Sequence, residues 1–171
     1  VDYRRVNAAT VADATPLPLM EKTLEGLGGS KVISTVDSSN AYMAIPMDER
    51  SSPLTAFICA FGLYEFRKLP FGLRNSGAVY SRMIGELVDQ LGLPGVIHYL
   101  DDILMHSKDF QSHLKLVDSV LGMHKREGLL IKPSKTVLFR EGVEFLGNWV
   151  SKEGLCPTDK AMGKIKDWPT P

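Results

Sequence analysis

Two adjacent acidic residues lie between two apolar runs near the middle of the chain. Asp101 and Asp102 separate residues 96–99 from residues 103–106, which predicts an acidic turn in a hydrophobic hairpin. An isolated Asp-Asp pair is usually a solvated turn. Here both flanking runs are apolar, and two carboxylates held together repel each other unless a cation lies between them. The pair is therefore a candidate site for a divalent metal ion.

A third acidic residue has similar surroundings. Asp37 follows the apolar run of residues 31–36, which predicts a buried strand. Alternatively, Asp37 is the N-cap of the turn that follows it. If the two strands meet in one sheet, three carboxylates offer the oxygen ligands that hard cations prefer. Two metal ions held there would stabilise the attacking and leaving oxygens of a phosphoryl transfer.

The elements that must position these acids follow from periodicity and turn residues. Residues 76–91 and 110–124 have the apolar spacing of amphipathic helices, and glycines follow at positions 92 and 128. The other predicted elements are a loop at 15–18, a short helix at 19–27, a hairpin of residues 54–61 and 64–69 around Gly62, and short strands within 129–150. Strands that alternate with isolated helices predict an α+β fold with a split βαβ core.

Composition restricts the class of protein. The chain has 171 residues, of which 44% are hydrophobic and 23% charged, as expected for one globular domain. Its formal net charge is zero, whereas nucleic-acid binders usually carry a basic excess. One segment, residues 67–82, is basic and has no acidic residues; it contains Arg67, Lys68, Arg74 and Arg82. We interpret this segment first as a solvated face.

Cysteines and apolar runs exclude further classes. Cys59 and Cys156 lack the spacing of a zinc site or a disulfide framework and are interpreted as reduced thiols. The four histidines lack metal-binding spacing and are interpreted as structural or solvated. No apolar run is long enough for a transmembrane span, so no membrane partner is expected.

Residues 99–102 (YLDD) resemble the YxDD box of reverse transcriptases, and other blocks match that family in the same order. These are residues 1–7 (VDYRRVN), Val36-Asp37 with Ala41-Tyr42, residues 55–57 (TAF), 62–66 (GLYEF), 69–76 (LPFGLRNS) and 144–147 (EFLG). The resemblance covers almost the whole chain and is strongest to the gypsy class of LTR retrotransposons. It implies an RNA-directed DNA polymerase region over residues 1–171, with a ferredoxin-like palm, part of the fingers and the start of the thumb approach.

The resemblance also implies a catalytic set. Asp37 and Asp101 would ligate two Mg²⁺ ions, with Mn²⁺ as an alternative, and Asp102 would have a more indirect metal role. The carbonyl group of Ser38 would lie near a metal. Lys135 would protonate the leaving pyrophosphate, with Lys132 as a competing candidate and a solvated turn lysine as the alternative interpretation.

Further positions would contact substrates. Tyr42 would exclude the 2′-hydroxyl of ribonucleotides and so select dNTPs, although a core aromatic is the alternative interpretation. The same resemblance places Ala41, Phe71 and Gly72 near the nucleotide. It places Asp2 and Arg4 near the template strand, and Arg74 either near the template or on the surface.

The sequence departs from the gypsy-type pattern at Ser38, Asn40, Ala44, Gly77 and Ser81. We also expect truncation at both ends, because the family's basic fingers residues and most of the thumb are not recognised. Two rival hypotheses are a decayed or domesticated retroelement fragment that keeps the fold, and a nucleotide cyclase on a similar palm. The LPFGL block and the VDYRRVN opening argue against the cyclase.

The resemblance implies partners and a location as well. The partners are an RNA or DNA template with its primer, dNTPs, and the remaining polyprotein domains (thumb, RNase H and integrase). The expected location is the cytoplasm, including virus-like particles, with access to the nucleus.

Overall fold

A five-stranded antiparallel sheet forms the centre of the computed structural model, which describes residues 1–14, 25–39 and 41–158. Its strands run in the order β4-β5-β1-β6, and β7 also pairs with β1. The strands are β1 (Val32–Ser39), β4 (Val96–Tyr99), β5 (Asp102–Ser107), β6 (Leu130–Ile131) and β7 (Val137–Arg140). The predicted apolar strands before and after the Asp-Asp pair are therefore confirmed as neighbours in one sheet.

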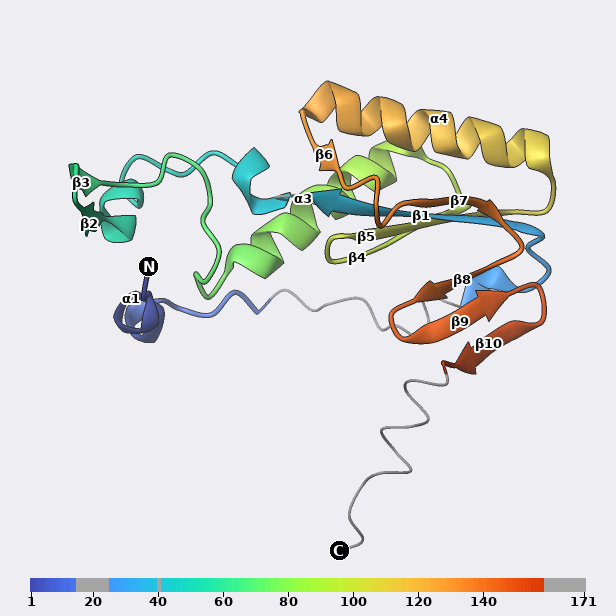
Figure 1. Ribbon diagram of the computed structural model, residues 1–171, viewed down its shortest axis with the longest axis horizontal. Coiled ribbons are helices and arrows are strands. Elements are labelled where there is room, and N and C mark those ends of the chain that lie inside the picture. The colour runs from blue at the N-terminus through green and yellow to red at the C-terminus, as the bar shows by residue number, and fades with distance from the viewer. Residues whose placement is uncertain (15–24, 40, 159–171) are drawn as a thin grey trace, which may run out of the picture.

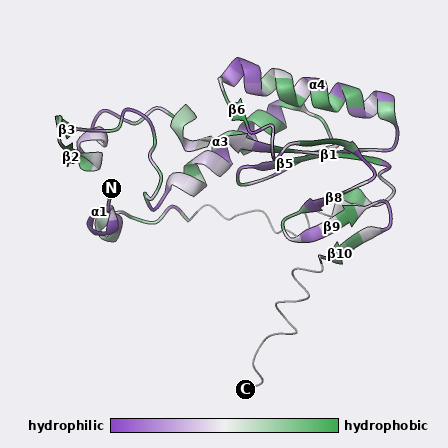
Figure 2. Ribbon diagram, in the orientation of Figure 1, coloured by the Kyte–Doolittle hydropathy of each residue, from purple (hydrophilic) through white to green (hydrophobic). Residues whose placement is uncertain are grey.

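Two helices cover one face of this sheet (Figure 1). They are α3 (Ser76–Leu91) and α4 (Phe110–Glu127), close to the predicted ranges. Each ends at a glycine in the left-handed region, where a side chain would be strained: Gly92 has φ 60° and Gly128 has φ 66°. Hydrophilic and hydrophobic residues alternate along α4 (Figure 2), as its amphipathic spacing predicts.

A second, smaller sheet packs on the opposite face of the central sheet. It consists of β8 (Gly142–Phe145), β9 (Asn148–Ser151) and β10 (Gly154–Pro157). Side chains on β5 alternate between the two cores: Ile103 and Met105 pack with the helices, whereas Leu104 packs with Phe145 of the second sheet. The central sheet is therefore buried on both faces, which explains its continuous apolar runs.

The remaining described elements are short, and the one that contains Leu27 packs against the second sheet. They are α1 (Arg4–Ala9), η1 (Glu25–Leu27), η2 (Ala41–Ala44), η3 (Ser52–Thr55), β2 (Phe57–Cys59) and β3 (Gly62–Tyr64). The β2–β3 hairpin lies at the end of the molecule away from β8–β10 (Figure 1). Of the short helix predicted at 19–27, the described part is η1; the predicted loop at 15–18 lies outside the described residues.

The predicted bounds of the hairpin were wrong. The strands are shorter than residues 54–61 and 64–69, and Gly62 begins β3 instead of forming the turn. The backbone N–H of Phe66 donates to Thr55 Oγ at 2.9 Å, so the chain leaves the ladder after Tyr64. Ile58 and Leu63 are 82% and 73% exposed, and Phe57 is the only residue of β2 and β3 that is even partly buried, so burial does not favour longer strands.

The overall architecture is α+β, as predicted. Among the described residues, no helix has both the length and the apolar character needed to cross a membrane. Cys59 and Cys156 are free and exposed, in agreement with the interpretation of both as thiols.

Candidate active site

Asp37 and Asp102 face each other across the central pair of strands. They are paired in the antiparallel register of β1 and β5, and neighbouring strands lie about 5 Å apart. Because side chains alternate along a strand, Asp37 lies on the same face as Ile33 and Asp102 on the same face as Leu104, away from the two helices. Asp37 lies inside β1, so the alternative interpretation as a helix N-cap was wrong.

An open groove lies in front of this pair, with a volume of about 600 Å³. One wall carries Asp37, Asp102 and Lys135, and the other is the turn between β8 and β9. The lining residues are Thr35, Val36, Asp37, Asp102, Lys135, Glu144, Phe145, Leu146 and Gly147. The block at residues 144–147, noticed in the sequence for its family resemblance, is thus brought to the carboxylates by the second sheet.

Asp101 lies in the tight turn between β4 and β5. The preceding residue, Leu100, has φ 53°, a left-handed conformation that costs a non-glycine residue about 1–2 kcal/mol. Such strain persists where the surroundings enforce it and is common at functional sites. The backbone N–H of Ser38 donates to the carbonyl oxygen of Asp101 at 3.3 Å, which ties this exposed acid to the end of β1.

Lys135 makes an ion pair with the first carboxylate. Its Nζ donates to Oδ2 of Asp37 at 2.8 Å, and the Asp37 side chain is only 15% exposed. This hydrogen bond and the charge of Asp37 raise the pKa of Lys135. Lys132, the competing candidate, has an exposed side chain and instead donates its backbone N–H to the carbonyl oxygen of Asp37 at 2.9 Å.

The acids also affect one another. Burial raises the pKa of Asp102, and the negative charges of Asp101 and Asp37 raise it further, while Lys135 partly opposes them. A carboxyl group with a raised pKa in a cleft is typical of a functional site. A cation placed between these acids would remove their repulsion.

The acids fit a divalent metal that takes part of its ligands from a substrate. Within residues 1–14, 25–39 and 41–158, no three acidic, histidine or cysteine side chains converge into a complete metal cluster. Mg²⁺ typically binds through one or two carboxylates plus substrate phosphates. The Lys135 ammonium group lies 2.8 Å from Oδ2 of Asp37, which shows that this carboxylate accepts a cation as its partner.

Tyr42 lies on η2, a short distance along the chain from Asp37. Its ring makes edge contacts with Phe71 and Tyr80, at centroid distances of 5.0 and 5.6 Å. Burial and the charge of Asp101 raise the pKa of Tyr42. Burial raises the pKa of Tyr80 to about 12. The sequence did not indicate a role for Tyr80 at this site, because its position in the helical repeat of α3 is typical of a core residue.

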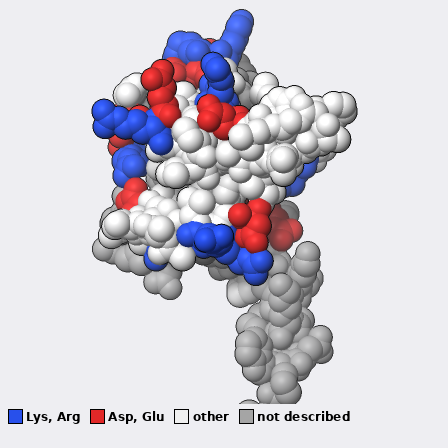
Figure 3. All heavy atoms as spheres, turned by 90° about the vertical axis from the view of Figure 1, so that its left-hand side faces the viewer, with Lys and Arg blue, Asp and Glu red and all other residues white. Residues whose placement is uncertain are grey.

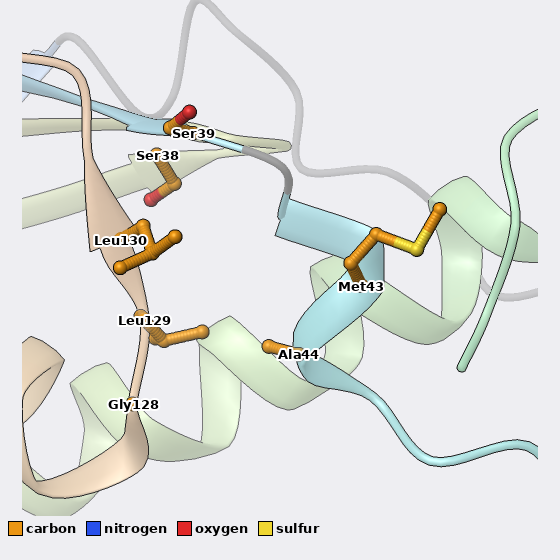
Figure 4. A pocket seen from close by; sticks show the side chains of 7 residues that line it. All are labelled: Ser38, Ser39, Met43, Ala44, Gly128, Leu129 and Leu130. Atoms are coloured by element: carbon orange, nitrogen blue, oxygen red, sulfur yellow. The ribbon is translucent and has the colours of Figure 1, made fainter. Parts of the chain in front are cut away.

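Ser38 is held from the helix side of the sheet. The Nδ1–H of His124 donates to the carbonyl oxygen of Val120 at 2.8 Å, so the Ser38 hydroxyl donates to the free Nε2 at 3.3 Å. Ser38 also borders a small cavity of about 140 Å³ between the end of β1, η2 and the segment after α4 (Figure 4). The interpretation of the histidines as structural is thereby confirmed for His124. No spacing in the sequence indicated its contact with Ser38.

The predicted nucleic-acid contacts lie outside this group of acids. Asp2 and Arg4 are both exposed and pair with each other at 2.7 Å. Arg74 donates to the backbone carbonyls of Asn7 and Thr10, and so fixes α1 to the segment before α3. Their roles toward a template stay predictions.

The loop before α3 carries two more predicted substrate positions. Phe71 is 54% exposed beside Tyr42. Gly72 has φ 93°, a conformation that favours glycine, and its carbonyl oxygen accepts from Asn7 at 2.8 Å. Ala41 begins η2 next to Tyr42. The loop thus places Phe71 beside Tyr42, the residue that is predicted to exclude a 2′-hydroxyl group.

The basic segment is not a continuous strip. Lys68 donates to the carbonyl oxygen of Ala44, and Arg82 pairs with Asp13 at 3.1 Å. On the face that carries the hairpin, basic and acidic side chains are interspersed (Figure 3). The segment thus contributes to internal contacts of the fold.

The split βαβ sheet, with carboxylates that line a groove between the central sheet and the β8–β9 turn, defines the class of palm-type phosphoryl-transfer domains. Residues 1–150 match the model of the family "Reverse transcriptase (RNA-dependent DNA polymerase)". The chain therefore belongs to the reverse transcriptase family.

Named relatives agree with the gypsy-class resemblance. The chain is 35% identical to the retrovirus-related Pol polyprotein from transposon opus and 32% to that from transposon gypsy, both of Drosophila melanogaster. Both alignments cover 100% of this chain, but only 17% and 16% of those proteins. The chain thus corresponds to a small part of a Pol polyprotein.

Solved structures show the same fold. The foamy viral protease-reverse transcriptase in complex with double-stranded DNA matches with a TM-score of 0.89 and 29% identity, over 99% of this chain and 30% of that one. Its complex with an RNA/DNA hybrid matches with a TM-score of 0.85 and 29% identity, over 99% and 23%. Reverse transcriptases as a family use divalent metal ions.

Proposed function

We propose that the chain is the catalytic core of an RNA-directed DNA polymerase within a retrotransposon Pol polyprotein. It adds nucleotides from dNTPs to the 3′-hydroxyl of a primer on an RNA or DNA template. The observation that carries this proposal is the pairing of Asp37 with Asp102 in the groove beside the second sheet, with Asp101 in the adjoining turn. The foamy viral relatives bound to DNA and to an RNA/DNA hybrid support the choice of partner.

Asp37, Asp101 and Asp102 would hold two Mg²⁺ ions, or Mn²⁺ in their place. When bound, these ions neutralise the phosphates and stabilise the entering and leaving oxygens. The protein contributes position: register fixes Asp37 against Asp102, and the strained turn at Leu100 presents Asp101. Lys135 Nζ lies in the same groove and carries a proton that it can donate to the leaving pyrophosphate.

The remaining predicted positions contact the substrates in this proposal. Tyr42, between Phe71 and Tyr80, excludes a 2′-hydroxyl, while Ser38, Ala41 and Gly72 border the nucleotide. A second set, Asp2, Arg4 and Arg74, lies toward the template. Thumb, RNase H and integrase domains of the polyprotein act with the chain, in the cytoplasm or in virus-like particles, with access to the nucleus.

Primer extension tests the proposal. Asp37→Asn and Asp101→Asn should each lower the rate of nucleotide addition more than about a hundredfold, because removing one preorganised charge contact typically costs that much. Asp118→Asn, which changes an exposed acid of α4, is the control and should keep the parental rate. Circular dichroism should show that the folds are unchanged. Near-parental extension by either site variant would sink the assignment.

A further inference from the structure

The ring of Tyr42 contacts two other aromatic rings, and its hydroxyl group lies near a glycine. The contact with Phe71 has an interplanar angle of 69°, and the contact with Tyr80 has an angle of 90°. A Cβ added at Gly77 would lie 3.8 Å from the Tyr42 hydroxyl oxygen. Such edge contacts between aromatic rings are directional, so they restrict where the Tyr42 ring can lie.

The three neighbours are not equally fixed. Phe71 is 54% exposed, whereas Tyr80 is 1% exposed. Tyr80 and Gly77 lie three residues apart on α3, which places them on the same face of the helix. The Tyr80 ring belongs to the core that joins α3 to Val36 of β1. Tyr80 is therefore the more rigid of the two aromatic neighbours of Tyr42.

The hydroxyl group of Tyr80 adds little to this arrangement. It is buried and lies toward Ser38, but it forms no hydrogen bond of ordinary geometry within the described residues. Burying an unpaired hydroxyl is unfavourable. The contribution of Tyr80 to Tyr42 therefore comes from its ring, which phenylalanine would reproduce.

We propose that Tyr80 is a positioning residue for sugar discrimination: its buried ring fixes the Tyr42 ring at the place where a 2′-hydroxyl would collide with it. The inference rests on the proposed function, because it assumes that Tyr42 faces the sugar of the incoming nucleotide. Tyr80 itself does not touch the nucleotide, since its side chain is enclosed by the core. Loss of its ring would let Tyr42 move aside and admit ribonucleotides.

The first test measures the contact itself and requires no activity. A double-mutant cycle on unfolding of the 171-residue chain compares Tyr42→Leu, Tyr80→Leu and the double variant. The coupling should amount to about a 2- to 10-fold change in the unfolding equilibrium constant, as for other aromatic pairs. Additive effects would overturn the proposal.

The second test measures the preference for dNTP over rNTP in primer extension. Tyr80→Leu should lower this preference by about 2- to 10-fold, the worth of one aromatic pair. Tyr80→Phe keeps the ring and should retain the parental preference. Val88→Ala is the matched control: it weakens the same core, but it lies eight residues further along α3, a rise of about 12 Å. It should reduce stability and leave the preference unchanged.

The outcomes separate the inference from the proposed function. If Tyr42→Ala admits ribonucleotides and Tyr80→Leu does not, Tyr80 is only a core residue and the inference is wrong. The same conclusion follows if Val88→Ala shifts the preference as much as Tyr80→Leu. If Tyr42→Ala leaves the preference unchanged, the sugar-filter assignment fails and the inference with it. A polypeptide that carries this chain together with its fingers and thumb regions and that adds no nucleotides at all would overturn the proposed function and the inference that rests on it.

Discussion

At the scale of single residues, the contact between Lys135 and Asp37 has two consequences. The lysine is 58% exposed, so solvent screens the pair and its contribution to stability is small. Its position matters more, because the ammonium group lies on an oxygen that a metal ion would also use. In the proposed function, Lys135 and a metal ion therefore compete for Asp37.

We predict that Lys135→Met strengthens Mn²⁺ binding to the 171-residue chain by about 2- to 5-fold, the range that an exposed ion pair supports. Electron paramagnetic resonance of free Mn²⁺ measures the affinity without any catalytic step. Lys132→Met is the control, because it removes an exposed charge from the same turn without touching the Asp37 carboxylate. Equal effects of the two variants would show that general charge, and not the contact, sets the affinity.

At the scale of elements, two glycines differ in the space around them. A Cβ at Gly95, just before β4, would lie 2.4 Å from the carbonyl oxygen of His106 and 2.8 Å from a methyl group of Leu116. A Cβ at Gly122, inside α4, would meet only the far end of Arg126 at 3.9 Å. Gly95 lets α4 pack closely on the β4–β5 hairpin, which carries Asp101 and Asp102. Gly122 has no such packing role and only lowers the helix propensity of α4.

Alanine at these two positions should therefore have opposite effects. Gly95→Ala should destabilise the fold by about 1–3 kcal/mol through overpacking. Gly122→Ala should stabilise it by up to about 1 kcal/mol, the difference in helix propensity. Urea unfolding of both variants and of the parent chain measures whether each substitution lowers or raises the free energy of unfolding. A stabilising Gly95→Ala would mean that β4 and α4 do not approach as closely as the structure shows.

The elements also show what a sequence can predict. Helices α3 and α4 follow from their apolar spacing and the glycines after them, because local patterns determine both. The bounds of β2 and β3 did not, since Ile58 and Leu63 are exposed and the backbone N–H of Phe66 donates to the side chain of Thr55. Asp37, Asp101 and Asp102 were selected as candidates from type and spacing; the structure pairs Asp37 with Asp102, and the metal role of all three stays a prediction. Tyr80 was not selected, because its contact with Tyr42 exists only after α3 and η2 pack together.

At the scale of the whole molecule, buried histidines join the layers of the fold. His113 of α4 lies between the hydroxyls of Ser34 and Ser107, at 2.7 and 3.1 Å. His106 of β5 contacts Ser30 at 2.8 Å. Burial lowers the pKa of all four histidines: His98, His106, His113 and His124. The folded state therefore favours the neutral imidazoles.

Stability should decrease as the pH falls below the ordinary histidine pKa of 6.5. In that range the unfolded chain binds more protons than the folded chain, so the free energy of unfolding decreases until the lowered pKa values are reached. We expect the urea midpoint to be constant above about pH 7.5 and to decrease toward about pH 5.5. A midpoint that stays constant over this interval would contradict burial of the neutral rings.

The two exposed thiols are sites at which fluorescent dyes can be attached to the chain. Cys59 lies on the β2–β3 hairpin and Cys156 on β10, toward opposite ends of the molecule (Figure 1). Maleimide dyes attached to these cysteines form a donor–acceptor pair that spans the fold without any engineered cysteine. Energy transfer between the dyes would report whether the hairpin bends toward the palm when a primer–template duplex is added.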